Sequence, residues 1–206
     1  MLQIFKILTF LSLMGLMYSC SQQPKDINDY ISWFAKEETG FVKRKQLNNL
    51  TYTVQYRPVD LMIINELKTL NNPQKDDIDS LKKNYGHSKY FLLEISPDNK
   101  GQNSGNLIKN FSTDYESYKE IVEELAFNIQ EQVELIIEGD TLAPRIYHYE
   151  QGYELSSNQR FLFAFQTKEK IKANEMTFIY NDHLFGSGRL KFQFNLKNSN
   201  IPSLPI

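Results

Sequence analysis

After Gln132 the sequence is dominated by alternation of apolar and polar residues. Successive side chains of a β-strand point to opposite faces of its sheet, so this period of two predicts strands with one packed face and one wet face. Ranges 145–150 and 176–180 indicate two further strands. No helical pattern separates these strands, and we therefore expect antiparallel pairing. The alternation is clearest in three runs: Val133, Leu135 and Ile137; Phe161, Phe163 and Phe165; and Leu190, Phe192, Phe194 and Leu196.

Earlier in the chain, apolar residues recur mainly at spacings of three and four, which is typical of helices. Thr113 and Glu116 have the spacing of a capping box at a helix start. The pair Asn48-Asn49 lies between two β-rich runs and predicts a hairpin over 41–56, because Asn tolerates positive φ. Range 89–96 indicates a buried strand. Helices are predicted over about 26–38, 59–70, 76–85 and 115–129.

Together these patterns predict an α+β fold, with helices packed on an antiparallel sheet and a C-terminal half that is mostly β. The chain has 206 residues, enough for one domain with a substantial core. It carries 23 Lys+Arg against 25 Asp+Glu, for a formal net charge of −2. Binding to nucleic acid requires clustered cations that neutralise phosphates. We therefore expect no nucleic-acid partner.

The first nineteen residues are typical of a secretory signal. Lys6 precedes an apolar run over 7–17, and small and polar residues follow. The run is shorter than the roughly 20 apolar residues that a membrane-spanning helix needs. Cys20, the sole cysteine of the chain, comes directly after this segment. A single cysteine has no partner for an internal disulfide. Its position directly after the signal segment therefore indicates a role other than disulfide formation.

The run Leu16-Met17-Tyr18-Ser19-Cys20 resembles the lipobox of bacterial lipoproteins, in a relaxed form similar to that of uncharacterised Bacteroidota lipoproteins. This resemblance implies cleavage before Cys20 and acylation of Cys20 with palmitate-type chains, which anchor the protein in a membrane. The alternative is a signal peptide with a chance cysteine. Ser21 after the cysteine, rather than Asp, resembles the context that sorts lipoproteins to the cell outer membrane. The resulting division is 1–19 signal peptide, 20–25 lipidated tether and 26–206 single α+β domain.

The sequence contains no recognised catalytic or cofactor-binding motif, so we expect no cofactor and identify no catalytic residue. Four residues are candidates for a ligand or metal site: His148 and Glu150, and Asp182 and His183. Residues two apart on a strand share a face, and these two pairs would bind a metal if neighbouring strands brought them together. A plainer interpretation makes His148 an ordinary strand residue and places Asp182 and His183 at the start of a turn.

Two short motifs bear on calcium and on glycosylation. The polar loop 98–106 lacks the Gly and acidic positions of an EF-hand, because Asn103 and Lys109 stand there, and we reject a calcium loop. Asp140-Thr141-Leu142 resembles the short O-glycosylation motif of Bacteroidota envelope proteins, which makes Thr141 a candidate acceptor. Asp79-Ser80-Leu81 matches the same pattern but lies in a predicted helix.

Three functions remain open. The first is a non-enzymatic docking or assembly subunit, anchored through lipid on Cys20 and bound to another envelope protein, with Tyr147, Tyr149 and Tyr153 as candidate contact residues. The second is a module that binds glycan or another small ligand through aromatic residues and the loops 98–106 and 181–188. The third is an envelope hydrolase that uses His148, Asp182 and His183.

Overall fold

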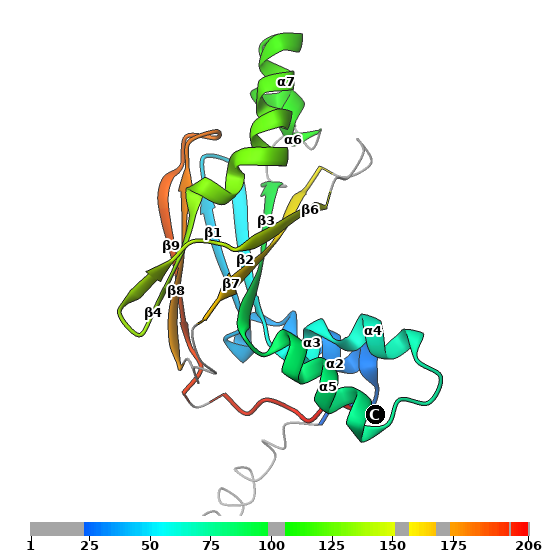
Figure 1. The fold of residues 1–206 in the computed structure, drawn as a ribbon. Helices are drawn as coiled ribbons and strands as arrows, with labels where there is room; N and C mark the ends of the chain where they lie inside the picture. The colour runs from blue at the N-terminus through cyan, green and yellow to red at the C-terminus, as the bar shows by residue number, and fades with distance from the viewer. Residues whose placement is uncertain (1–22, 99–105, 151–156, 168–173, 198, 206) are drawn as a thin grey trace, which may run out of the picture.

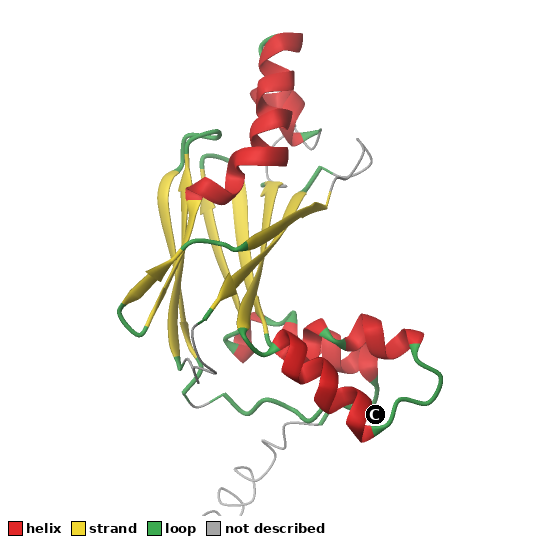
Figure 2. Cartoon of the chain, viewed as in Figure 1, coloured by secondary structure: helices red, strands yellow, loops and turns green. Residues whose placement is uncertain are grey.

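Two antiparallel sheets face each other at the centre of the structure (Figure 1, Figure 2). The structure is a computed structural model, and it describes residues 23–98, 106–150, 157–167, 174–197 and 199–205. Cys20, the signal segment, Tyr153 and most of the loop 98–106 lie outside the described residues. The predicted α+β class and the antiparallel pairing are confirmed.

The larger sheet has five strands and the smaller has four. Every pairing between neighbouring strands is antiparallel. In spatial order, the first sheet contains β1 (Val42–Leu47), β2 (Leu50–Arg57), β3 (Ser88–Pro97), β7 (Gln159–Gln166) and β6 (Ile146–Glu150). The second contains β5 (Asp140–Leu142), β4 (Val133–Ile137), β8 (Glu175–Asp182) and β9 (Gly188–Asn195).

Two-residue turns set the register of two hairpins. Asn48 and Asn49 have φ angles of 53° and 61°, which confirms the predicted turn between β1 and β2. Glu138 and Gly139, with φ angles of 52° and 91°, form the corresponding turn between β4 and β5, which the sequence pattern does not predict. Both turns have the positive φ angles that match the twist of paired strands.

The core between the sheets is largely aromatic. Phe178 of β8 is fully buried, and its ring centroid lies 5.3 Å from that of Phe91 on β3 and 6.0 Å from that of Phe163 on β7. These contacts join the two sheets, so the inward side of each predicted alternating run packs against the opposite sheet. Large rings bury extensive apolar area, which makes this layer the main source of stability.

Helices at one end of the sheets form a second, smaller core. Asp26 caps the first of them by accepting hydrogen bonds from the N–H groups of Asn28 at 2.7 Å and Asp29 at 2.9 Å. The predicted helix 59–70 is interrupted at Ile63. The elements are α2 (Ile27–Phe34), the 3₁₀-helix η2 (Glu37–Thr39), α3 (Val59–Met62), α4 (Ile64–Thr69) and α5 (Lys75–Tyr85). The small core contains Tyr30, Phe34, Phe41, Leu61 and Ile64.

A further helical segment rises from the other end of the sheets (Figure 1). It consists of α6 (Leu107–Phe111), α7 (Tyr115–Glu123), the π-helix η3 (Glu124–Asn128) and the 3₁₀-helix η4 (Ile129–Gln132). The capping box predicted for Thr113 and Glu116 is wrong. Asp114 and Ser117 form it instead: Asp114 accepts from the N–H of Ser117 at 2.8 Å, and Ser117 Oγ accepts from the N–H of Asp114 at 3.1 Å.

The second sheet changes how the helices pack. The sequence predicts helices on a sheet face, but in the structure each sheet covers the inner face of the other and the helices lie at the two ends (Figure 2). In the ranges that the structure describes, none of the helices has the length and hydropathy needed to cross a membrane.

Candidate functional site

The four candidate metal or ligand residues lie on different sheets. His148 and Glu150 are on β6, at one edge of the five-stranded sheet. Asp182 ends β8 in the other sheet, and His183 follows it as an exposed residue. Glu150 forms an ion pair with Arg160 Nη1 at 3.0 Å. The sequence interpretation required neighbouring strands, and β6 and β8 are not neighbours.

The separation of His148 from Asp182 follows from the strand order. Asp182 accepts a hydrogen bond from Tyr52 on β2, and β3 and β7 lie between β2 and β6. Three strand spacings amount to about 14 Å. His148 also alternates with Tyr147 and Tyr149, which pack on the core, so it points away from the space between the sheets. The structure therefore does not bring the four residues together, and the described residues contain no metal-binding group of three His, Cys, Asp or Glu.

Asp182 has a structural environment. Its side chain is 2% exposed and accepts hydrogen bonds from the Tyr52 hydroxyl at 2.7 Å and from the N–H groups of Phe185 and Ser187 at 2.9 Å each. Burial raises the pKa of Tyr52 well above its ordinary value, and the adjacent Asp182 carboxylate adds to the shift. The carboxylate thus fixes the turn between β8 and β9 and ties it to the opposite sheet.

Tyr147 and Tyr149 do not form an exposed patch. Their rings stack on Phe163 and Phe161, with centroid distances of 6.3 and 4.8 Å. The Tyr147 hydroxyl donates to the carbonyl of Ala126, and the Tyr149 hydroxyl donates to the side-chain carbonyl of Gln159. Burial raises the pKa of Tyr149 to about 12. Both tyrosines therefore close the β6 side of the core instead of offering a contact surface.

Thr141 is exposed on the short edge strand β5. The hydroxyl is on a strand with a single neighbour, β4, which leaves room for a modifying enzyme to approach. Glycosylation of Thr141 stays a prediction.

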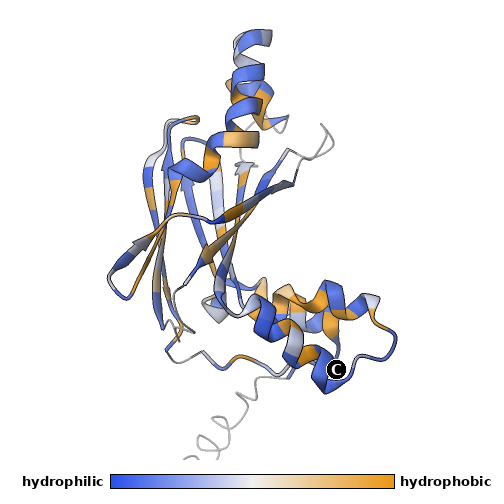
Figure 3. Cartoon of the chain, in the orientation of Figure 1, coloured by the Kyte–Doolittle hydropathy of each residue, from blue (hydrophilic) through white to orange (hydrophobic). Residues whose placement is uncertain are grey.

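Exposed aromatic residues gather instead on residues 107–132, the segment that rises from the sheets and that we call the prong. Phe111 is 37% exposed, Tyr115 74% and Phe127 67%. None of the residues of α7 is buried. Figure 3 shows apolar and polar residues interleaved along the prong, which rises above the sheets. These exposed rings make the prong the candidate interaction surface of the described residues.

The prong is acidic. It contains six Asp and Glu against two Lys, Lys109 and Lys119. Lys119 is itself paired with Glu116 at 2.9 Å. Hydrogen bonds from Ser117 hold the pKa of Asp114 below its ordinary value, so this carboxylate stays charged at the helix start. The prong therefore combines exposed aromatic rings with an excess of negative charge, although Lys119 Nζ lies 5.6 Å from the centroid of the Tyr115 ring.

The base of the prong is firmly attached. Leu125 and Ile129 are fully buried in the core between the sheets. Within the π-helix, the Glu124 carboxylate accepts hydrogen bonds from Asn128 Nδ2 at 2.8 Å and Gln132 Nε2 at 2.9 Å. Single π-turns of this kind occur often at functional sites. A rigid base with a free tip suits a part of the molecule that must reach a partner.

The sequence predicts the helix of the prong but not the exposure of its aromatic residues. The apolar stripe of α7, which includes Tyr115, Tyr118 and Val122, has a spacing that predicts a helix facing the core. Spacing alone does not tell how much of the stripe finds a partner. The structure shows that the stripe packs against the core from Tyr118 to Leu125 and is open at Tyr115.

The comparisons with known proteins assign no family. No protein-family model matches the chain, and no curated protein matches it. A solved structure of a protein described as a novel protein of unknown function, from Burkholderia pseudomallei K96243, aligns with a TM-score of 0.36 and 6% identity over 82% of this chain and 84% of that chain. A likeness at this level assigns neither a shared fold nor a function.

Proposed function

We propose that this protein is a lipid-anchored envelope protein, localised at the outer membrane, that acts without catalysis as a docking or assembly subunit. The prong is its contact surface. The observation that supports docking is the exposure of Phe111, Tyr115 and Phe127, which lie on three successive helical elements of the prong. Aromatic residues are enriched in the buried centres of protein interfaces.

The charge of the prong indicates which kind of partner surface it would bind. The prong contains six Asp and Glu against two Lys, so a complementary surface offers an apolar patch bordered by Lys and Arg. An anionic membrane surface would repel the same face. The proposed partner is therefore another envelope protein.

The lipid anchor would orient the molecule for this role. Residues 20–25 precede α2, and six extended residues span at most about 20 Å. The α2 end would thus lie close to the membrane, while α7 is at the opposite end of the sheets (Figure 1). The prong would point away from the membrane, and confinement to the membrane would raise its effective concentration near a membrane-bound partner.

The test is affinity purification of the tagged full-length protein from detergent-solubilised envelope of its host. We expect a stoichiometric envelope complex with the wild type and loss of the complex with Tyr115→Ser/Phe127→Ser. The matched control is Leu70→Ser/Ile146→Ser, since these residues are 40% and 66% exposed and lie outside the prong. Recovery of the wild type alone, or retention of the complex by the prong variant, would refute docking through this surface.

A further inference from the structure

A basic groove runs along the side of the molecule where the two sheets meet without pairing. β1 and β9 are both edge strands, and they contact each other although no ladder joins them. The hollow beside them has a volume of ≈ 360 Å³, and a larger one of ≈ 860 Å³ adjoins it and shares Lys43 and Gln193. The smaller hollow is lined by Glu37, Val42, Lys43, Arg44, Lys45, Lys191, Phe192 and Gln193.

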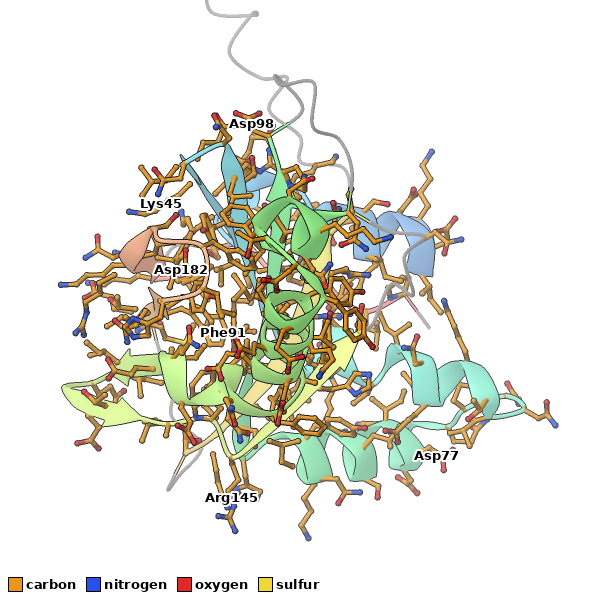
Figure 4. All side chains as sticks on the ribbon, turned by 90° about the horizontal axis from the view of Figure 1, so that it is seen from above. Lys45, Asp77, Phe91, Asp98, Arg145 and Asp182 are labelled. Carbon is orange, nitrogen blue, oxygen red and sulfur yellow. The ribbon has the colours of Figure 1, made fainter. Side chains whose placement is uncertain are left out.

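The two strands concentrate positive charge. Ranges 42–47 and 188–197 contain six Lys and Arg and no Asp or Glu. Lys43 and Lys45 are two residues apart and so share a face of β1. Lys45 Nζ lies 5.8 Å from the ring centroid of Phe192 on β9. Figure 4 shows Lys45 at the margin of the molecule, on the side of the hairpin that follows Asp182.

Carboxylates are few around the smaller hollow, where Glu37 is the acidic lining residue, while Glu138 and Glu175 line the larger one. Arg44 forms an ion pair with Glu37 at 3.0 Å. Among the described residues, Lys43, Lys45 and Lys191 form no ion pair with a carboxylate. Lys43, Lys45 and Lys191 all line this hollow, and an anion bound there would offset the mutual repulsion of their positive charges.

Lysines on edge strands also hinder unwanted strand pairing, and one or two of them would need no other explanation. That role requires only exposed charge along an edge. It does not require cationic residues from two strands of different sheets to line one common hollow, to which the buried Phe192 also contributes. The groove therefore has the arrangement of a binding site, in which a concave surface presents a few convergent polar groups.

We propose that this groove binds a phosphate-bearing anion, with Lys43, Lys45 and Lys191 as its ligands. Lysine is a point-charge donor that suits phosphate oxygens. The groove extends to Glu37 and Val42, which follow α2, the element nearest the lipidated tether. Two sources of phosphate fit this position: the headgroup of a membrane lipid and a free polyphosphate. This inference does not depend on the prong.

The experiment measures binding to the purified lipidated protein in a neutral maltoside detergent. Isothermal titration uses inorganic pyrophosphate, short-chain dihexanoyl phosphatidic acid and, as the neutral control, dihexanoyl phosphatidylcholine. We expect the first two to bind and compete, the third not to bind, and the affinity to fall as salt is raised. Stronger binding of the phosphatidic acid identifies a headgroup site, and stronger binding of pyrophosphate identifies a site for free polyphosphate.

The deciding variant is Lys43→Gln/Lys45→Gln/Lys191→Gln, for which we expect at least a tenfold loss of affinity. Its matched control, Lys68→Gln/Lys75→Gln/Lys83→Gln, removes the same charge from α4 and α5 and should bind as the wild type does. Lys191→Gln alone, on an exposed position of β9, replaces the triple variant if that one does not fold. Equal loss in the control, or no phosphate binding by the wild type, overturns the proposal.

Discussion

Asp182 accepts hydrogen bonds from the Tyr52 hydroxyl and from the N–H groups of Phe185 and Ser187. Asp182→Ala would leave the N–H groups of Phe185 and Ser187 without their acceptor, while the Tyr52 hydroxyl keeps Ser187 Oγ at 2.8 Å. Each such loss costs about 1–3 kcal/mol. We expect the free energy of unfolding to fall by about 2–4 kcal/mol in urea denaturation, because the loop relaxes in part.

Asp140→Ala is the control for this prediction, since Asp140 is exposed on β5 and a surface change of that kind shifts stability by less than about 0.5 kcal/mol. Equal stability of Asp182→Ala and the wild type would contradict a structural role for this carboxylate. It would also mean that Asp182 is free to take part in chemistry.

The raised pKa values of two half-buried tyrosines predict how the free energy of unfolding changes at alkaline pH. Burial raises the pKa of Tyr56 and of Tyr149 to about 12 in the folded protein, whereas an unfolded chain has a value of about 10. Between these values the unfolded state loses protons that the folded state keeps. The free energy of unfolding should therefore hold up to about pH 10 and fall as the pH rises toward 12.

Urea denaturation from pH 8 to pH 12 measures this dependence. Tyr149→Phe removes one ionisation and should make the decline shallower. A decline of the same slope in wild type and Tyr149→Phe would show that other groups cause it.

At the scale of elements, the start of α7 depends on the Asp114 cap. Hydrogen bonds from Ser117 lower the pKa of Asp114, so the cap contributes fully above the unfolded-state pKa and is lost as the pH falls through the folded-state value. Asp114→Ala removes the cap at every pH. We expect faster hydrogen exchange of the amides in the first turn of α7, with an unchanged urea midpoint for the protein, because residues 114–116 are exposed and the core contacts of α7 begin at Tyr118.

Asp76→Ala provides the comparison, because Asp76 lies in the first turn of α5 while Gln74 and Asp77 form its capping box. This variant should leave exchange in α7 unchanged. A lowered urea midpoint for Asp114→Ala would mean that α7 is part of the cooperative core, and the prong would then not be a free element.

Local sequence pattern predicts some of the structural elements and fails to predict others. The hairpin turn at Asn48 and Asn49, the cap at Asp26 and the alternating strands are predictable because each depends on neighbours in sequence. The cap at Asp114 is not, because Thr113 offers an equally good motif one residue earlier. The pairing of strands into two sheets is also beyond local pattern, since alternation tells which face is apolar but not what covers it.

The candidate site is still less predictable. His148 and Asp182 have suitable chemistry for a metal site, but strand order, which is a property of the whole fold, separates them. The exposed tip of the prong depends on where α7 ends relative to the sheets. Exposure of Tyr115 is a fact of tertiary structure that helical spacing does not encode.

At the scale of the whole molecule, charge is segregated by location. The net charge of −2 conceals an acidic prong at one end and a basic groove along β1 and β9. The net charge averages over the acidic prong and the basic groove, so it predicts neither a cationic nor an anionic partner. In the proposed arrangement, the helical end faces the membrane, the groove lies beside it, and the prong reaches away toward a protein partner.

Docking through the prong is tested most directly by site-specific photocrosslinking in intact cells of the host, with a benzoylphenylalanine placed at Tyr115 or, as the control, at Leu70. We expect one discrete envelope-protein adduct from position 115 and none from position 70. Cys20→Ala should weaken the adduct, because the prong loses its confinement to the membrane. Absence of an adduct from position 115, or the same adduct from both positions, would contradict docking through the prong.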